Sequence, residues 1–482
     1  MNQVIDYHAI LPELILSGTI LLVLVVDVWL SAEHKAWSMP VALVGVVASL
    51  AATLSLVGQH RTTFGGMFVV DSFTVLLQVF FLTVAIVVLA ISYRYFREGR
   101  FYQGEYYFLL LTSFLGCLLM PGSRDLLMLF VALELVSAPG FLIAAFRKSD
   151  SRSNEAGLKF FLIGVLSSAV MLYGMSLIYG VTGATNLVSI GLALGKPLGQ
   201  SATLVDAAIL FIVTGFAFKV SAAPFHFWAP DTYEGAPVPV AAFLSVASKA
   251  AGFAGLLLLM FVAFPHQASF WTPIFAVLSI LTMTIGNFVA LQQTQIVRLL
   301  AYSSIAQAGY MLLPFALAGH GVDRAAFSAT VLYILIYGVM QLGAFAVVVG
   351  VAREARVLIS DFAGMTRRAP VLAIAMTIFL VSLGGIPPTG GFWAKFAIFR
   401  VAIDAGGSGP ALAVVMLVNS VVSLYYYLAV ARQMVAVESD EPRRGVQVLV
   451  TGVAALAAVA VFAIGVYPEL LAHFPPLSTV VR

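Results

Sequence analysis

The run LVDAAILFIVTGFAFKVSAAPFHFW, residues 204–228, decides the fold class of this chain. It is apolar over the roughly 20 residues that a helix needs to cross a bilayer. Two features depart from a plain membrane helix: Lys219 lies inside the run, and Pro224 lacks the backbone donor that a continuing helix requires. A lysine near the bilayer centre costs roughly 2.5–3.5 kcal/mol, and such residues usually mark ion or proton pathways. The run therefore predicts a broken transmembrane helix with a role in transport.

The composition places the whole chain in the membrane. Of 482 residues, 61% are hydrophobic and 10% are charged, the mean hydropathy is +1.02, and a soluble protein is about 25% charged. We expect an all-α, polytopic membrane protein. The single cysteine, Cys117, excludes internal disulfides, thiolate iron–sulfur clusters and cysteine-based zinc sites. The chain has no GxxxxGK[ST] motif and no GxGxxG motif opening a βαβ unit, which argues against nucleotide binding.

Apolar runs of membrane-spanning length recur along the chain with short connections. The first 8 residues carry no Lys or Arg, so we expect the first run to remain as a helix and not to be removed as a signal peptide. The sequence predicts about 14 transmembrane helices, at roughly 9–30, 38–58, 70–93, 106–121, 124–146, 156–180, 204–228, 238–263, 271–292, 295–318, 325–351, 369–402, 411–436 and 446–467.

Lysine and arginine are unequally shared between the two faces that these helices define. One face collects 15 of them: Lys35, Arg94, Arg97, Arg100, Arg147, Lys148, Arg152, Arg298, Arg353, Arg356, Arg367, Arg368, Arg432, Arg443 and Arg444. The other face collects 6: Arg61, Arg124, Lys196, Arg324, Arg400 and Arg482. Cytoplasmic loops carry the excess of basic residues, so the first face is expected to be cytoplasmic or matrix-facing. Both termini then lie on the opposite side.

Two of the predicted helices are interrupted by proline and glycine. The seventh breaks around Pro224, and the twelfth breaks at GGIPPTGGF, residues 384–392. The breaks are five helices apart, so the two helices run in opposite directions. Paired interrupted helices of opposite direction are typical of an inverted repeat, with the transport site at the breaks. We therefore predict an N-terminal three-helix segment (1–100), a first five-helix repeat (101–265), a second, inverted one (266–437) and a C-terminal helix (438–482).

Four charged residues lie deep inside apolar runs. Glu134 and Lys219 are candidates for a pair in which a carboxylate tunes the proton affinity of a lysine, because burial disfavours a charged lysine and a nearby carboxylate favours it. Lys249 and Lys395 are candidates for proton-carrying amines in the middle of the membrane. The structural alternatives are an ion pair that only fixes helix packing, or, for Lys219, a side chain that snorkels to the interface.

Other polar residues have weaker signals. Lys159 is expected either to stay at the interface or to point inward as a relay. His226 titrates in the physiological range and suits proton uptake, although a lone histidine at a helix end is as often structural. Asp231 and Glu234 follow it closely, but without further partners this spacing does not make a metal site. Two acids flank the first run and are expected to reach the interfaces: Glu13 and Asp27.

Several motifs together resemble a known family. They are KVSAAPFHFWAPDTYEGAPVPV (219–240), Glu134 within Ala-Leu-Glu-Leu, RLLAYSSIAQAGY (298–310) and GIPPTGGFWAKF (385–396). The chain resembles the antiporter-like proton-channel subunits of respiratory complex I and of Mrp-type cation/proton antiporters, over about residues 70–435. EAGLKFF (155–161), Lys395 and the short C-terminal region further resemble the N-type branch, the counterpart of mitochondrial subunit 2.

The resemblance implies a function and a set of partners. It implies that Glu134 and Lys219 form a switching pair, that Lys249 is the central relay, that Lys395 serves the exit side and that Lys159 modulates the pair. It further implies a non-redox subunit of a proton-pumping NADH–quinone oxidoreductase in the bacterial inner membrane, with no cofactor of its own and no nucleic-acid partner. Flavin and iron–sulfur clusters are expected in partner subunits. The expected neighbours are the lipid bilayer, sister antiporter-like subunits and the lateral helix of subunit L.

One position departs from the family pattern, and two other functions stay open. Gln307 stands where many relatives have histidine, and an amide cannot titrate, so water or Tyr310 would have to bridge at this point. The first alternative function is an Mrp-type cation/proton antiporter without a redox partner. The second is a membrane scaffold whose buried charges only fix helix packing.

Overall fold

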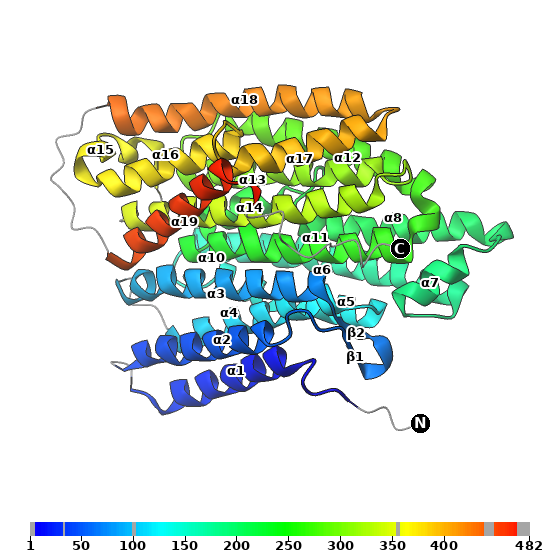
Figure 1. Cartoon of the computed structure of the whole chain (residues 1–482). Coiled ribbons are helices and arrows are strands. Elements are labelled where there is room, and N and C mark those ends of the chain that lie inside the picture. The colour runs from blue at the N-terminus through cyan, green and yellow to red at the C-terminus, as the bar shows by residue number, and fades with distance from the viewer. Residues whose placement is uncertain (1–4, 32–33, 99–102, 353–356, 438–447, 470–482) are drawn as a thin grey trace. The chain divides into compact units, whose positions relative to one another are not determined.

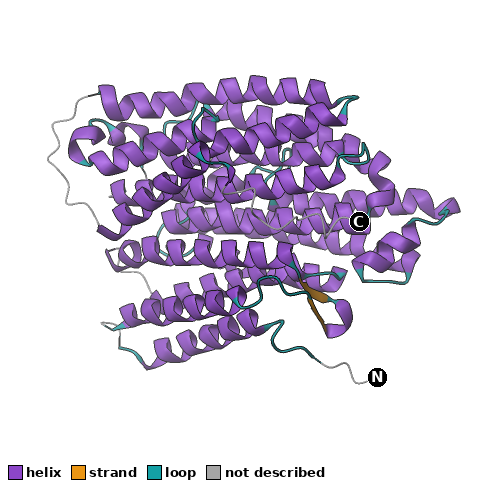
Figure 2. Cartoon of the chain, in the orientation of Figure 1, coloured by secondary structure: helices purple, strands orange, loops and turns teal. Residues whose placement is uncertain are grey.

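The computed structural model describes residues 5–31, 34–98, 103–352, 357–437 and 448–469. Nearly all of them are helical, with one small hairpin (Figure 2). Of the basic residues used to predict orientation, those outside the described residues are Arg100, Arg353, Arg356, Arg443, Arg444 and Arg482.

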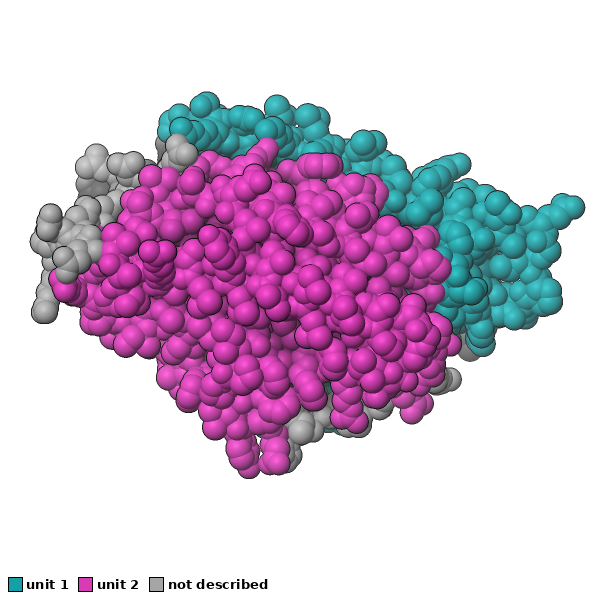
Figure 3. Space-filling view, turned by 90° about the horizontal axis from the view of Figure 1, so that it is seen from above, with its two compact units in different colours: residues 1–220, 247–271, 475–482 teal, residues 221–246, 272–474 magenta. Residues whose placement is uncertain are grey.

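The described residues form two compact units, coloured separately in Figure 3. Unit 1 comprises residues 1–220 and 247–271, and unit 2 comprises residues 221–246 and 272–474. The chain therefore passes from unit 1 to unit 2 after Val220, and back again inside the helical segment that precedes Lys249. The four-part division predicted from the sequence stays a prediction.

The first part of the chain, to residue 219, contains eight α-helices, four short 3-10 turns and one hairpin within the described residues; Figure 1 shows how they are arranged. The elements are α1 (Leu11–Trp29), η1 (Lys35–Trp37), α2 (Ser38–Leu54), β1 (Arg61–Thr63), η2 (Phe64–Gly66), β2 (Phe68–Val70), α3 (Ser72–Glu98), α4 (Gln103–Leu119), η3 (Met120–Gly122), α5 (Leu126–Ala144), α6 (Ser151–Thr182), α7 (Leu187–Leu194), η4 (Gly199–Ser201) and α8 (Ala202–Lys219).

The named elements of the rest of the chain are all helices or helical turns within the described residues. The elements are α9 (Trp228–Gly235), α10 (Val238–Phe243), η5 (Leu244–Ser248), α11 (Lys249–Leu258), η6 (Leu259–Ala263), η7 (Pro265–Gln267), α12 (Ala268–Ala290), α13 (Ile296–Leu312), η8 (Leu313–Leu317), α14 (Asp323–Val351), η9 (Ile359–Phe362), α15 (Met365–Arg368), α16 (Pro370–Gly384), α17 (Gly390–Ala405), α18 (Gly409–Ala436) and α19 (Val448–Val466).

These helices confirm the predicted membrane protein. Within the described residues, 13 helical segments are long and apolar enough to cross a bilayer. The broken pair α16 and α17 occupies the predicted twelfth segment and brings the number to the predicted 14. The clearest difference lies in the seventh segment, because α8 ends at Lys219 and residues 220–227 are not helical.

The hairpin was not predicted. Its strands β1 and β2 pair antiparallel, with Arg61 opposite Val70. The turn between them uses left-handed backbone at Phe64, Gly65 and Gly66. The hairpin completes an apolar cluster with the start of α1 and the end of α2, formed by Ala9, Ile10, Leu56, Phe68, Val70 and Val75. The fold is therefore almost purely helical, with one three-residue strand pair covering an end of the N-terminal helices.

Each break has a local cause in the sequence. After α8, Ser221 takes a left-handed conformation with φ 60°, and the following Pro224 cannot continue a helix. After α16, Gly385 is left-handed with φ 86°, and the N–H of Ile386 reaches back to the carbonyl of Val381. This is a Schellman-type helix end, which glycine permits at no steric cost.

The predicted eighth segment, 238–263, is one helical run with two changes of pitch. The π-helical segment η5 directly precedes Lys249, and η6 ends the run. Short π-helical segments inside α-helices are frequent at functional sites. Nearly all of this run is buried, so Lys249 lies in a helix surrounded by protein.

Candidate functional site

Lys219 is buried in unit 1, at the C-terminal end of α8. Its side chain is only 2% exposed, and its ammonium donates to the hydroxyl of Ser137 on α5 at 2.9 Å. The Ser137 hydroxyl in turn donates to the carbonyl of Leu133 at 2.7 Å. Residues in the last turn of a helix lie near its negative dipole end, so this position favours a cation. The Lys219 side chain does not snorkel to the interface, because it is buried and its ammonium is bonded to Ser137 on the neighbouring helix α5.

Glu134 lies one turn before Ser137 on α5 but has a different partner. Its carboxylate accepts from the hydroxyl of Ser168 on α6. No ion pair joins Glu134 and Lys219 within the described residues, where Lys219 is bonded to Ser137. The two groups predicted as a switching pair are therefore each bonded to a different serine, and the serine that holds Lys219 lies one helical turn from Glu134 on α5. The switching role itself stays a prediction.

Lys249 begins α11 and is 1% exposed. Gly252 lies three residues later, on the same face of the helix. A Cβ atom at Gly252 would come within 3.0 Å of both the Lys219 Cγ and the Val220 Cγ1 atoms. The stem of Lys219 therefore packs against the face of α11 that carries Lys249. Because Gly252 has no side chain, the stem of Lys219 can lie close to the helix that carries Lys249, and both lysines belong to unit 1.

Lys395 lies in unit 2, on α17, and reaches back across the second break. Its ammonium donates to the carbonyl of Gly384, the last residue of α16, at 3.0 Å, and lies 4.7 Å from the ring centre of Tyr310. Both contacts suit a cation, because the carboxyl end of a helix and the face of an aromatic ring each carry a partial negative charge. The side chain is 8% exposed. The broken helix thus supplies the group that holds the lysine.

A network of buried amides and phenols surrounds this lysine in unit 2. The Tyr310 hydroxyl accepts from the Asn287 side chain at 2.9 Å, and Tyr426 donates to the same amide at 3.0 Å. Gln307 donates to the Leu383 carbonyl at 3.1 Å and to the Tyr427 hydroxyl at 3.2 Å. The Gln307 carbonyl accepts from Tyr333. The described residues therefore surround Gln307 with the Leu383 carbonyl and the hydroxyls of Tyr427 and Tyr333. The predicted bridge by water or Tyr310 stays a prediction.

Sequence reasoning missed most of this network. Asn287, Tyr333 and Tyr427 lie in apolar runs. A neutral tyrosine or asparagine costs less free energy in a membrane helix than a charged residue, so these positions do not indicate a site as a buried lysine does. The signal was present in the sequence, since Tyr333 and Tyr337 are spaced one helical turn apart on α14. Tyr337 donates to Ser304 at 2.9 Å, so the same helix face continues the network.

The segment after the first break carries the remaining candidates. His226 is 5% exposed, and burial lowers its pKa below the ordinary histidine value. Asp231 and Glu234 each accept from Arg298 at 2.8 Å, which ties α9 to α13. The described residues contain no group of three or more His, Cys, Asp or Glu side chains that could hold a metal. These two acids therefore have a visible structural role.

Lys159 and Glu13 lie in contrasting environments. Lys159 pairs with Glu155 one turn earlier on α6 at 2.7 Å, with side chains that are 44% and 63% exposed. It therefore lies on an exposed face of unit 1. Glu13, expected at an interface, is instead buried, and accepts from Gln78 at 2.6 Å. The other acid of α1, Asp27, is also buried and pairs with Lys35 at 3.0 Å near the helix end.

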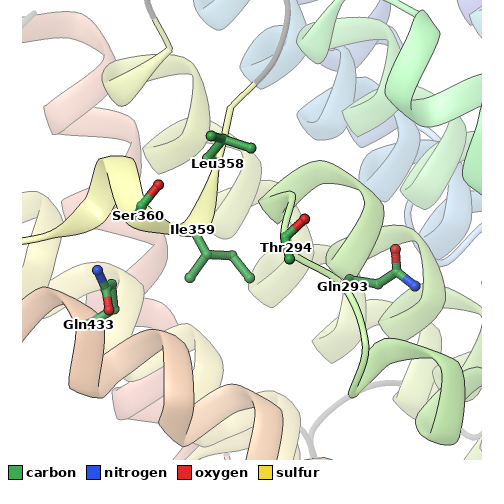
Figure 4. A pocket seen from close by; sticks show the side chains of 6 residues that line it. All are labelled: Gln293, Thr294, Leu358, Ile359, Ser360 and Gln433. Carbon is green, nitrogen blue, oxygen red and sulfur yellow. The ribbon is translucent and has the colours of Figure 1, made fainter.

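Unit 2 has an open pocket of about 610 Å³ that contains none of the predicted relay residues. Figure 4 shows its lining, which comes from the α12–α13 connection, the start of η9 with the residue before it, and α18: Gln293, Thr294, Leu358, Ile359, Ser360 and Gln433. None of these side chains titrates near neutral pH. The pocket therefore offers hydrogen-bonding groups but no proton-carrying ones.

Comparison with known proteins places this arrangement in a family. Residues 123–423 match the family described as NADH:quinone oxidoreductase/Mrp antiporter, transmembrane. The chain belongs to this family. It is 41% identical to NADH-quinone oxidoreductase subunit N of Trichlorobacter lovleyi, in an alignment that covers 89% of this chain and 87% of that protein.

Solved structures agree with the family assignment. A chain of respiratory complex I from Thermus thermophilus with bound aureothin superposes with a TM-score of 0.80 at 32% identity, covering 95% of this chain and 98% of that one. A chain of the Mrp complex from a Dietzia species has a TM-score of 0.84 at 20% identity, covering 97% and 96%, and so shares the fold. The matched family segment contains Glu134, Lys219, Lys249 and Lys395. The chain is thus an antiporter-like membrane protein of the complex I type.

Proposed function

We propose that this chain is the N-type, proton-translocating membrane subunit of a proton-pumping NADH–quinone oxidoreductase. The chain carries protons across the membrane, and oxidation and reduction take place in partner subunits that hold flavin and iron–sulfur clusters. Its own residues need no cofactor for this task. The observation that carries the proposal is the packing of the Lys219 stem against Gly252, on the helix face of Lys249.

The proposed route uses four residues in turn. A proton enters near His226, is taken up at the Glu134–Lys219 pair, passes to Lys249, and then to Lys395. Buried amines suit this task because burial makes a lysine able to give up its proton. Lys219 held on Ser137, and Glu134 held on Ser168, define one state of the pair. Direct contact between the two charges is the other state, and Lys159 modulates the exchange between them.

The proposed setting is a bacterial inner membrane. The excess of basic residues on one face supports a cytoplasmic location for that face, with both termini in the periplasm. The neighbours in the assembly are sister antiporter-like subunits and the lateral helix of subunit L. The identity of 41% to a subunit N, over most of both chains, supports this assembly more than an Mrp complex, for which the likeness is in fold.

Purification of the tagged full-length chain from its native membrane tests the proposal. We expect flavin- and iron–sulfur-containing subunits to co-purify, and the preparation to reduce quinone with NADH. An Mrp-type antiporter would instead co-purify with other transporter subunits only, and membranes containing it would exchange sodium for protons without NADH. That second result would overturn the proposal in favour of the alternative.

A further inference from the structure

A buried acid in the N-terminal helices lies outside the proposed lysine route. Glu13 occupies the first turn of α1 and is 5% exposed. One carboxylate oxygen, Oε1, accepts from the side-chain amide of Gln78 on α3 at 2.6 Å. The same Gln78 nitrogen makes a longer bond of 3.3 Å to the carbonyl of Leu118, at the end of α4. Three helices of unit 1 therefore enclose this carboxyl group.

Two acceptor atoms of the Glu13–Gln78 pair lack a hydrogen-bond donor among the described residues. Among the described residues, neither Glu13 Oε2 nor Gln78 Oε1 has a hydrogen-bond partner, although both atoms are buried. A buried acceptor left without a donor costs about 1–3 kcal/mol. An acid and a primary amide joined through one N–H···O bond can close a ring through an O–H···O bond. One hydrogen on Glu13 Oε2 would therefore satisfy both atoms.

Among the described residues, no salt bridge joins Glu13 to a cation, and the hydrogen bond to its side chain comes from the neutral amide of Gln78. Helix α2 has no titratable residue, and the only one on α4 near Leu118 is the buried thiol of Cys117. The next basic residue along the chain after Leu118, Arg124, is bound to Asp71 at 2.7 Å. Asp27, the other acid of α1, pairs with Lys35 of η1 at the far end of α1. A buried charge without a partner is costly, and the group is more stable when neutral.

We propose that Glu13 and Gln78 form a second proton-holding site, in which the neutral acid shares its hydrogen with the glutamine amide. This inference rests on the proposed function, because it assigns the site a step in proton transfer. During turnover the proton leaves Oε2 for a water molecule, and the bonding electron pair stays on the carboxylate. Gln78 acts as a positioning residue that fixes the acid through its N–H.

The location of the site suggests its place in the sequence of transfers. Glu13 lies one helical turn after Ile10, which belongs to the apolar cluster under the hairpin. Gln78 likewise lies one turn after Thr74, whose hydroxyl contacts the carbonyl of Val69 in β2. The hairpin follows α2, on the face that carries the fewer basic residues. The site therefore belongs to the side on which protons are released.

Infrared difference spectroscopy of the assembled complex, upon reduction by NADH, tests the inference. The wild type is expected to show a carbonyl band of a protonated carboxylic acid, which moves to lower frequency in D₂O. Glu13→Gln should remove this band, and Gln78→Leu should shift it to higher frequency, because the acid loses the N–H bond. If Glu13 were an ionised carboxylate with only a structural role, there would be no protonated-acid band for Glu13→Gln to remove or for Gln78→Leu to shift. Glu105→Gln is the matched control, since this exposed acid of α4 pairs with Lys148, and it should leave the band in place.

The outcomes separate this inference from the proposed function. Absolute infrared spectra in which Glu13→Gln loses no protonated-acid band overturn the second proton site, whatever Lys249 does. A band that Glu13→Gln removes from the absolute spectrum, but that does not appear in the NADH difference spectrum of the wild type, overturns the transfer step and shows a static neutral acid. A complex that pumps normally without Lys249 overturns the proposed function instead, and the static infrared band of Glu13 is unaffected by that result.

Discussion

Replacing Ser137 by alanine probes the state in which Lys219 and Glu134 are held apart. The Ser137 hydroxyl accepts from the Lys219 ammonium at 2.9 Å, and Lys219 is 2% exposed. A hydrogen bond to a charged group contributes about 1.5–3 kcal/mol, and every 1.4 kcal/mol is a tenfold change in an equilibrium. Ser137→Ala should therefore shift the equilibrium toward the Glu134-bound state by about tenfold to about a hundredfold.

The expected consequence is a loss of pumping. If Lys219 must leave Glu134 to pass its proton on, a pair that is stabilised in its closed form releases the proton less often. The initial rate of NADH-driven proton uptake in proteoliposomes should fall by at least about tenfold, by the same free-energy conversion. Ser168→Ala, which frees Glu134 from its hydroxyl partner, should act on the same equilibrium, so the two substitutions should be non-additive.

Ser176→Ala is the matched control for Ser137→Ala. The Ser176 hydroxyl is exposed on α6 and donates to the carbonyl of Tyr173 in its own helix. It should pump like the wild type. If Ser137→Ala pumps as fast as this control in fully assembled complexes, Ser137 does not regulate the pair, and the reasoning from its hydrogen bond is refuted.

Three further predictions follow from contacts in the two units. Gly252→Ala places a Cβ within 3.0 Å of the Lys219 stem, so it should slow pumping and cost about 1–3 kcal/mol of stability by overpacking, measured by thermal unfolding; unchanged values would refute the close approach. Tyr310→Leu should slow pumping more than Tyr310→Phe, because only leucine removes the ring that faces Lys395; equal rates would contradict a cation–π role. Burial lowers the pKa of His226, so its neutral form is favoured in the fold and stability should fall as pH drops below 6.5; a His226→Gln variant with the same pH profile would contradict this.

The sequence predicted the membrane helices and their breaks because these depend on local properties. The length of each apolar run predicted a helix. Pro224, and Gly385 with the prolines that follow it, predicted the interruptions. The burial of Lys219 and Lys249 also followed from their place in apolar runs. The hairpin at 61–70 escaped prediction because three-residue strands are too short to show an alternating pattern.

The partners of the buried charges could not be predicted, because they depend on how helices pack. Nothing in the local sequence indicates that Lys219 bonds Ser137, 82 residues away, or that Lys395 reaches Gly384. The π-helical segment before Lys249 was equally hidden, since its residues continue the same apolar run. Glu13 was assigned to the interface from its position near a helix end, and its burial became visible only with the neighbouring helices in place.

The proton-to-electron ratio of a Lys249 variant tests the central claim most directly. Lys249→Ala, and Lys249→Met as a version that preserves side-chain volume, are introduced into the fully assembled complex, with the exposed Lys196→Ala as the matched control. We predict that both Lys249 variants lower the number of protons pumped per NADH oxidised or stop pumping altogether, whereas the control keeps the wild-type ratio. An unchanged ratio together with unchanged turnover would contradict a proton relay through Lys249 and would leave its charge with a role in packing alone.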